Sequence, residues 1–285
     1  MDKLEQQTIT KTNASIEISY ESLIGAGGTV SVPKWNLTHD QFLQCQKTFQ
    51  KYKFGLTSLD ITMHMGNSIF SGIWTKGKAG DFGLAQAPYA AFPDLFRDLL
   101  NSNRFPSLVV GHSENNSVNY YVSWDRQPSN NSQYVAVYVH MDDATYRHKL
   151  SELSANNYAL INQHQYDYMG ERYFNGIWMS TLSMWGYSNW MTIQNAIAWK
   201  DGLINYGMIP MRLQAHAGRT DLECFGIAQG GVTNVNGWYI GIGMNGQDLS
   251  QFHDNYKKQG LVIRDLSSYS YGQSLWYNAI WVNYK

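Results

Sequence analysis

The segments Ile69–Trp74 (IFSGIW), Tyr173–Trp178 (YFNGIW) and Trp276–Trp281 (WYNAIW) are versions of one short aromatic strand that ends in tryptophan. Two further segments, Asn119–Trp124 (NYYVSW) and Glu223–Ala228 (ECFGIA), follow the same pattern in weaker form. The last positions of the five segments follow one another at intervals of 50 to 54 residues. A period this regular is typical of one supersecondary unit that has been duplicated along the chain.

Each copy of this strand stands at the end of a unit in which a helix is followed by two strands. In the first unit Phe42, Cys45 and Phe49 are spaced as one face of a helix, and Thr38 with Gln41 forms a capping box at its start. After each helix the period of the apolar residues changes to two, which predicts a pair of strands joined by a short turn. The expected turns contain Gly66, Asn115–Asn116, Gly170, Gly218 and Gly272.

The sequence therefore predicts an α+β, β-rich fold of five tandem β-α-β-β repeats of about 50 residues in a propeller-like or superhelical array. A third strand before the helix is clearest at Tyr134–His140 and Trp238–Gly243, whereas the first unit lacks a strong strand of this kind. In the second unit Pro93 is tolerable only in the first turn of a helix, so that helix is expected to begin around Ala91 or Phe92.

The unit boundaries follow from the same spacing. Residues 1–32 are expected to form an N-terminal arm, in which Ser15–Leu23 makes a strand that completes the sheet of a terminal repeat. The expected repeats, which form one repeat domain over 33–285, are residues 33–82, 83–131, 132–185, 186–235 and 236–285.

The composition excludes several classes of protein. The formal net charge is −1 and only 15% of the residues are charged, without a run of Lys or Arg, so binding to nucleic acid is not expected. No apolar run reaches the length of a membrane span, and the N-terminus lacks the apolar region of a signal peptide. The chain is then either cytosolic or the mature form of a secreted protein. Cys45 and Cys224 are expected to be buried free thiols.

Four histidines stand in the strand–turn–strand regions of successive units, namely His64, His112, His164 and His216. Repeats that are related by rotation would bring such side chains to one rim, where they can form a polar or metal-binding site. The simpler interpretation is that each is a solvated side chain on its own hairpin. The sequence predicts no bound metal and no other cofactor, and the four histidines are candidate binding residues.

Aromatic residues that depart from the repeat are the other candidates for binding, because loops on a rigid scaffold usually carry recognition. The repeated tryptophans, by contrast, are expected in the core. The candidates are Tyr166, Tyr168, Tyr269 and Tyr271 at hairpin tips, and Trp185 and Trp190 between the third and fourth units.

Acidic residues give two further candidate sites. His140, Asp142 and Asp143 offer three metal ligands, although a strand-to-helix junction with capping carboxylates explains them more simply. The second set consists of carboxylates on the hairpins, which can pair as general acid and base: Asp60, Asp167, Glu171 and Asp221. No HExxH, GxSxG, Walker A or CxxC motif occurs.

The motif strands and the turn glycines resemble a bacterial tandem-repeat family whose modules often precede β-lactamase-like serine hydrolase domains. The N-terminal half of fungal polyglycine hydrolases is similar. The resemblance covers nearly the whole chain after residue 33. The chain departs from the family pattern at Ala228, where tryptophan is expected, and at Pro106. The resemblance implies an array of β-rich repeats. Because no hydrolase domain follows Lys285, it implies no catalytic residue here.

The function that the sequence favours is that of a non-catalytic binding module, which takes a carbohydrate or an extended polypeptide at its hairpin loops. One alternative is a secreted hydrolase or effector enzyme whose site converges only in three dimensions. The other is a self-assembling, toxin-like protein whose open repeat edges pair between chains to form an oligomer.

Overall fold

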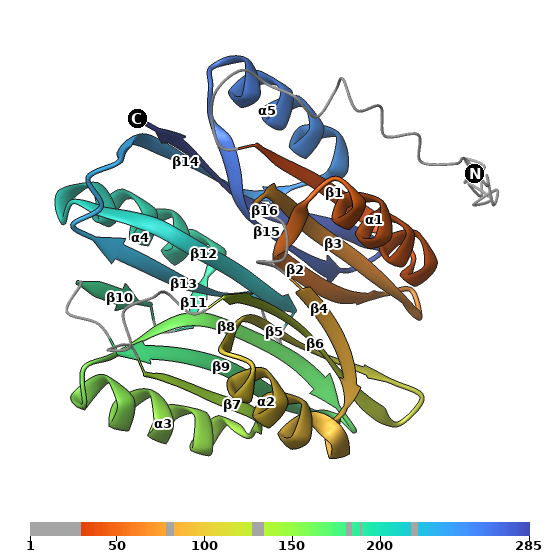
Figure 1. Cartoon of the computed structure of the whole chain (residues 1–285). Coiled ribbons are helices and arrows are strands. Elements are labelled where there is room, and N and C mark those ends of the chain that lie inside the picture. Colours follow the sequence, from red (N-terminus) through yellow and green to blue (C-terminus); the bar gives the residue numbers. More distant parts are fainter. Residues whose placement is uncertain (1–29, 78–82, 127–133, 181–183, 189, 218–221) are drawn as a thin grey trace.

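The computed structural model describes residues 30–77, 83–126, 134–180, 184–188, 190–217 and 222–285. Within these residues the strands form five small antiparallel sheets, and each sheet is accompanied by a helix (Figure 1). The structure is therefore β-rich and built from repeated small sheets, as the spacing of the motif strands predicts. None of the described helices combines the length and apolar character that a membrane crossing needs.

The elements recur in the same order along the chain. They are β1 (Ser31–Leu37), α1 (His39–Lys51), β2 (Phe54–His64) and β3 (Asn67–Lys76); β4 (Gly83–Pro88), the 3-10 helix η2 (Tyr89–Ala91), α2 (Phe92–Asn101), β5 (Arg104–Glu114) and β6 (Ser117–Arg126); β7 (Val135–Met141), α3 (Asp143–Ala155), β8 (Tyr158–Tyr168) and β9 (Glu171–Ser180); β10 (Trp185–Tyr187), β11 (Met191–Thr192), α4 (Ile193–Asn205), β12 (Met208–Ala217) and β13 (Leu222–Gly230); β14 (Val235–Met244), α5 (Gly246–Lys258), β15 (Val262–Tyr271) and β16 (Ser274–Tyr284).

The motif strand is the central strand of every sheet. The strand orders are β1-β3-β2, β4-β6-β5, β7-β9-β8 and β14-β16-β15, and in the remaining sheet β13 pairs with β10, β11 and β12. A central strand is covered by neighbours on both edges and by packed layers on its faces, which explains why the motif consists of aromatic and small apolar residues.

The first sheet has a leading strand, contrary to the expectation that this strand is weak. Strand β1 pairs antiparallel with β3 and places Val32 opposite Trp74. The expected strand at Ser15–Leu23 lies outside the described residues, and the first sheet already contains its third strand in β1.

The helices begin where the sequence predicts. Thr38 and Gln41 form the expected capping box of α1, and the side chains of Asp142 and Thr192 cap α3 and α4. Helix α2 begins at Phe92 and holds Pro93 in its first turn, where a missing N–H is harmless. Asn245 caps α5 in the same way, so four helices have a side-chain cap that pairs a backbone amide of the first turn.

The hairpin turns also match the prediction where they are described. Met65 with Gly66, and Met169 with Gly170, each combine two positive φ angles, as a two-residue type I′ turn requires. Asn115 and Asn116 do the same in the second sheet, because asparagine tolerates this conformation better than other non-glycine residues. The twist of such turns matches the twist of the two strands that they join.

The repeated tryptophans belong to the core, as expected. Trp74, Trp178 and Trp281 are each 0% exposed. The indole of Trp178 covers Gly176 so closely that a Cβ added there would lie 2.2 Å from the ring. Gly176 therefore leaves the room that the indole of Trp178 needs to cover its own strand.

The fourth unit keeps the indole but takes it from another element. Ala228 stands where the motif has tryptophan, and a Cβ added to Gly226 would lie 2.4 Å from the ring of Trp199 on α4. Trp199 therefore covers Gly226 as Trp178 covers Gly176. This unit therefore packs differently from the others, because its helix supplies the aromatic ring.

The units share their cores with their neighbours. Leu108 and Tyr121 of the second unit pack in the same cluster as Phe42 and Trp74 of the first. The first strand of each hairpin, which we call the inner strand (β2, β5, β8, β12 and β15), contacts the inner strand of the next unit. Strand β15 of the last unit lies beside β2 of the first (Figure 1). Segments more than 200 residues apart are thereby brought into contact.

A first prediction concerns the relocated indole. Ala228→Trp should destabilise the protein by about 2 kcal/mol, because Trp199 already fills the space that the new ring needs. In a Trp199→Ala background, which itself should cost about 3 kcal/mol, the same substitution should regain stability. Urea unfolding of the four proteins in this double-mutant cycle measures the coupling, and equal costs of Ala228→Trp in both backgrounds would show that the rings do not share a site.

A second prediction concerns the indole N–H. Trp74 Nε1 donates to Gln46 Oε1 at 2.7 Å. Gln46→Leu leaves this buried donor without a partner and should lower the free energy of unfolding by about 1–2 kcal/mol. Gln50→Leu on the exposed part of the same helix is the matched control and should change it by less than about 0.5 kcal/mol. The two substitutions should be indistinguishable if the hydrogen bond contributes nothing.

Candidate functional site

A β-bulge recurs at the same place in every inner strand. The residue before the bulge lies opposite the last residue of the motif strand, as Leu56 lies opposite Trp74 and Leu160 opposite Trp178. One extra residue then follows, and the pairing resumes one residue later. These extra residues are Thr57, Ser107, Ile161, Met211 and Arg264.

The residues that follow the bulge alternate along each strand and present polar groups on one face. The first position after the bulge holds Ser58, Asn162, Arg212 and Asp265 in four of the units. Two residues further along, the same face carries Asp60, His164, Gln214 and Ser267. All of these side chains are at most 7% exposed. The second unit departs from the pattern, because Leu108 and Val110 occupy the equivalent positions.

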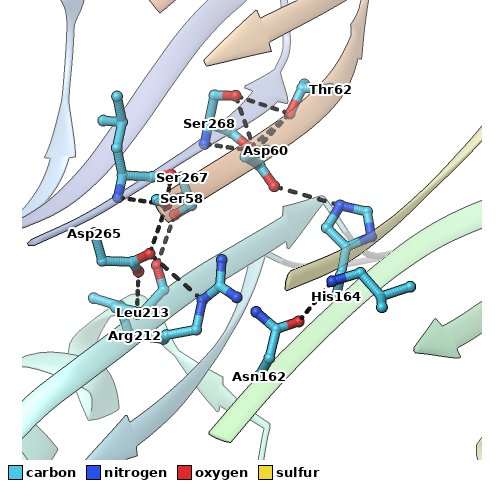
Figure 2. Close-up of polar contacts among 12 residues, drawn as sticks. Ser58, Asp60, Thr62, Asn162, His164, Arg212, Leu213, Asp265, Ser267 and Ser268 are labelled. Atoms are coloured by element: carbon cyan, nitrogen blue, oxygen red, sulfur yellow. Dashed lines mark hydrogen bonds and ion pairs between the residues drawn. The ribbon is translucent and has the colours of Figure 1, made fainter. Parts of the chain in front are cut away.

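Asp265 joins three units through its carboxylate (Figure 2). Its Oδ1 accepts a hydrogen bond from Ser58 Oγ at 2.9 Å, and its Oδ2 accepts one from the backbone N–H of Leu213 at 2.9 Å. The guanidinium of Arg212 lies beside it, with Nε 3.4 Å from Oδ1. We call these residues together with Asp60, Thr62, Asn162, His164, Ser267 and Ser268 the central polar cluster.

Asp60 makes the corresponding junction nearer to the hairpin turns. Its Oδ2 accepts hydrogen bonds from the backbone N–H and the hydroxyl of Ser268, at 2.8 and 2.9 Å. Its Oδ1 lies 3.6 Å from Nε2 of His164, which reaches it from β8 (Figure 2). Burial lowers the pKa of His164, and the carboxylate of Asp60 opposes this effect.

Several polar atoms of this interior have no hydrogen-bond partner among the described residues. They include Nδ1 of His164, Oε1 of Gln214 and both amide atoms of Gln165. An unpaired buried polar atom costs about 1–3 kcal/mol. Several such atoms in one interior therefore indicate that water or a polar ligand fills part of it.

A cavity opens at each end of the central polar cluster. The turn-side cavity has a volume of about 150 Å³, and its lining includes Asp60, Gln165, Tyr166 and Tyr269. The bulge-side cavity has a volume of about 270 Å³ and is lined by the five extra residues of the bulges together with Asn162, Arg212 and Asp265.

The four candidate histidines lie on the inner strands but do not meet at one point. His112 and His216 occupy equivalent positions and line the turn-side cavity, His164 lies deeper in the cluster, and His64 lies nearer the turns. Each contacts another unit, since His64 Nδ1 bonds to Ser270 Oγ at 2.8 Å and His216 Nε2 lies 3.3 Å from Asp167 Oδ1.

His112, on the second unit, also contacts a neighbouring unit. Its Nε2 bonds to Ser68 Oγ at 2.8 Å, and burial lowers its pKa. No group of three or more histidine, cysteine or acidic side chains with the geometry of a metal site occurs in the part of the chain that the structure describes. The histidines therefore serve as polar links between neighbouring units in this arrangement.

The candidate tyrosines divide into two pairs. Tyr166 and Tyr269 line the turn-side cavity but are only 6% and 3% exposed, so little of either ring is open for stacking. The hydroxyl of Tyr166 bonds to Tyr120 and, at 2.6 Å, to Nδ1 of His140. Tyr168 packs with Tyr173, and Tyr271 is 57% exposed near its turn.

The two candidate tryptophans are packed beside the fourth sheet, away from both cavities. Trp190 contacts Phe174 and Phe225, and the guanidinium of Arg172 lies over its ring. Trp185 is the first residue of β10 and packs partly buried against the same hydrophobic cluster. The structure thus places Trp185 and Trp190 in contacts between the third and fourth units.

The acidic candidates also have structural partners. Asp142 accepts from the N–H of Thr145 as the cap of α3, and Asp143 pairs with Arg147, which confirms the simpler interpretation of this junction. Among the hairpin carboxylates only Asp60 enters the central polar cluster. Asp221 lies outside the described residues.

The sequence interpretation did not single out Arg212, Asp265, Asn162 or Gln165, although all four are buried and line one of the two cavities. The signal that could have found Arg212, Asp265 and Asn162 is the alternation after the bulge, which puts polar residues on a face where a covered strand would carry apolar ones. Gln165 lies on the other face of β8 from Asn162 and His164, so the alternation does not mark it.

Three residue patterns in this chain invite a catalytic interpretation. Asp60 lies between Ser268 and His164, whereas a serine nucleophile needs the histidine between the serine and the carboxylate. Ser31 and Lys34 have SxxK spacing, but they lie three residues apart on β1 and so face opposite sides of the strand. Neither arrangement activates a serine.

The third pattern is a GxGxxG spacing at Gly241, Gly243 and Gly246, where β14 leads into α5. A Cβ at Gly241 would lie 2.4 Å from the sulfur of Met244, and Gly243 has a φ of +66°. The first free amides of α5 already bond to the side chain of Asn245. These glycines are therefore explained by packing and by the turn, in an antiparallel sheet that lacks the parallel βαβ unit of a dinucleotide site.

A third prediction follows from the buried histidine. The unfolded chain takes up a proton on His164 near its ordinary pKa of 6.5, while burial keeps the folded side chain neutral to lower pH. The free energy of unfolding should therefore fall as the pH drops below about 6.5, and His164→Gln should flatten this fall by up to about 1.4 kcal/mol per pH unit. Burial also lowers the pKa of His112, His140 and His253, so part of the slope remains.

The control for this prediction is His148→Gln on the exposed side of α3, which should leave the slope unchanged. Urea unfolding between pH 5 and 8 measures all three proteins. Identical slopes for wild type and His164→Gln would contradict the assignment of a buried neutral imidazole.

Comparison with known proteins connects the repeated unit to a family. A sequence model described as "polyglycine hydrolase-like, structural repeat" matches residues 32–77, 134–181 and 235–284, which together make up about half of the chain. Each matched segment runs from the leading strand to the end of the motif strand of one sheet. No curated protein sequence matches the chain. The chain belongs to the family of polyglycine hydrolase-like structural repeats.

Proposed function

We propose that the protein is a non-catalytic recognition module that binds an extended polypeptide with small side chains at the turn-side cavity. The observation that carries this proposal is Gln165. It lines the cavity and is 6% exposed, and neither atom of its amide has a partner among the described residues. A peptide unit loses its hydrogen bonds to water when it is buried. A side-chain amide can replace them, because it donates one hydrogen bond and accepts another.

Charge and shape agree with such a ligand. The cavity joins carboxylates and histidines, with Asp60 and Asp167 opposite His112 and His216, so it offers both acceptors and donors without a large net charge. Its volume of about 150 Å³ favours a narrow chain over a bulky one. The family description names a hydrolase of polyglycine, a polypeptide without side chains.

A carbohydrate is the competing ligand. Sugar sites commonly use an open aromatic face for stacking, and the two tyrosines that line the cavity are almost fully buried. The exposed Tyr271 near its turn offers such a face at a single position. These contacts support the polypeptide over the sugar.

We infer further that the five sheets are copies of one β-α-β-β repeat, closed around the central polar cluster in a propeller-like array. The contact of β15 with β2 supports closure, since the last unit then completes the ring with the first. Self-assembly is the alternative, because β1, β4, β7 and β14 lie at the ends of their sheets' strand orders. Light scattering that finds a monomer at high concentration would favour the closed array.

A fourth prediction tests the ligand. Pentaglycine should bind with saturable heat in calorimetry, and Gln165→Leu should weaken binding about tenfold, because the peptide unit loses two hydrogen bonds in a buried site. Gln194→Leu on the exposed face of α4 is the matched control and should bind like wild type. Mass spectrometry of the peptide after prolonged incubation should find it intact.

Other results would contradict the proposal in distinct ways. Binding of chitohexaose or cellohexaose without binding of pentaglycine would assign the cavity to sugars. Cleaved pentaglycine would make the protein an enzyme. Equal affinity of Gln165→Leu and wild type would move the peptide site elsewhere on the molecule.

A further inference from the structure

The geometry points to a second binding site at the opposite end of the central polar cluster: the bulge-side cavity binds a small oxyanion, a carboxylate or phosphate group, between Arg212 and Arg264. Both arginines line this cavity of about 270 Å³. It lies on the far side of the buried cluster from Gln165, so this inference does not depend on the peptide site.

Arg212 is the first part of the argument. It is 7% exposed, yet its guanidinium makes no aligned hydrogen bond among the described residues, and Nε is buried without a partner. Its nearest acceptor is Oδ1 of Asp265, at 3.4 Å from Nε. A buried guanidinium normally has its fork of donors filled by carboxylate or phosphate oxygens.

Asp265 does not fill this role, because its contact with Nε of Arg212, at 3.4 Å, is an ion pair without the alignment of a hydrogen bond. Oδ1 accepts the hydroxyl of Ser58 and Oδ2 accepts the N–H of Leu213, both at 2.9 Å. The carboxylate therefore balances one positive charge without satisfying the donors of Arg212. What remains is a buried cation with unused donors at the edge of a cavity.

Arg264 supplies a second cation from the neighbouring strand. It is the extra residue of the bulge in β15, and its Nη1 donates to the hydroxyl of Tyr284 at 2.7 Å, which fixes the guanidinium at the cavity wall. The charged residues of the lining are Arg212, Arg264 and Asp265, so the wall has one positive charge in excess. Anions are attracted to such a wall, and more strongly because it is partly desolvated.

Hydroxyl groups complete the lining. Thr57 and Thr75 share a hydrogen bond at 2.9 Å, and Thr75 is joined to Ser31 at 2.8 Å. A linked row of hydroxyls can turn a donor toward an oxyanion without breaking the whole row. The pocket thus offers two guanidinium groups and several hydroxyl donors, and Asp265 is the one carboxylate in its described lining.

The experiment titrates the whole chain with inorganic phosphate, and separately with acetate, at constant ionic strength in chloride. Calorimetry should show saturable binding of at least one of the two anions. Arg264→Gln should weaken that binding about tenfold, because a charged donor is lost, while Arg264→Lys should retain most of it. Arg97→Gln, a 68% exposed arginine on α2, is the matched control and should bind like wild type.

Arg212 is tested together with its partner, because removal of the arginine alone leaves the carboxylate of Asp265 buried without a cation. The double variant Arg212→Gln/Asp265→Asn keeps the interior neutral and should lose binding at least tenfold. In wild type with ¹⁵N-labelled arginine, the Nε–H signals of Arg212 and Arg264 should shift on titration, whereas that of Arg97 should not.

The anion that binds more tightly shows which chemical group the natural ligand carries. Tighter binding of phosphate supports a phosphate group, and tighter binding of acetate supports a carboxylate. The inference is overturned if neither anion binds saturably, or if Arg264→Gln and Arg97→Gln bind alike. Loss of pentaglycine binding in Gln165→Leu should leave anion binding unchanged, which separates the two sites.

Discussion

The bulge in each inner strand decides which side chains reach the interior of the molecule. It lies opposite the last residue of the motif strand, so the terminal tryptophan and the bulge occupy the same level in four of the five sheets. The extra residue shifts the alternation of side chains between the two faces of the strand by one position. Residues before the bulge pack toward the tryptophan, while residues after it turn Ser58, Asn162, Arg212 and Asp265 inward. The two cavities and the buried polar row between them depend on that single shift.

A buried polar interior destabilises the fold unless its polar groups form hydrogen bonds or ion pairs across units. Asp60 and Asp265 are the two acceptors that hold it together, and both take backbone N–H groups as well as side-chain donors from strands that are remote in sequence. The second unit contributes Leu108 and Val110 instead, and these pack into the hydrophobic core that contains Phe42. The polar row is therefore asymmetric, and its unpaired atoms lie mainly on β8 and β12. The two proposed ligand sites therefore lie beside these unpaired atoms, and not at a position that recurs in every repeat.

Local features of the fold could be predicted from the sequence because each depends on neighbouring residues. The capping box at Thr38, the start of α2 near Pro93 and the turn at Met65–Gly66 are of this type. The candidate site could be predicted only in part. His112 and His216 stand at equivalent places in their repeats and line one cavity, but the pairing of Asp60 with His164 depends on how units about 100 residues apart are placed. The alternation after the bulge marks Arg212 as inward-facing, but nothing in its own strand shows that Asp265 will lie beside it.

The indole of Trp199 has a consequence for how such chains are recognised. In this unit the helix, not the strand, carries the ring that covers the glycine of the motif, and the core is filled all the same. Natural selection can therefore move the aromatic ring from one element to another while the packed volume stays constant. A relative could lose the terminal tryptophan from every motif strand and still fold alike. Its kinship would then be visible in the spacing of glycines and helices, and no longer in the aromatic residues that make the repeat conspicuous.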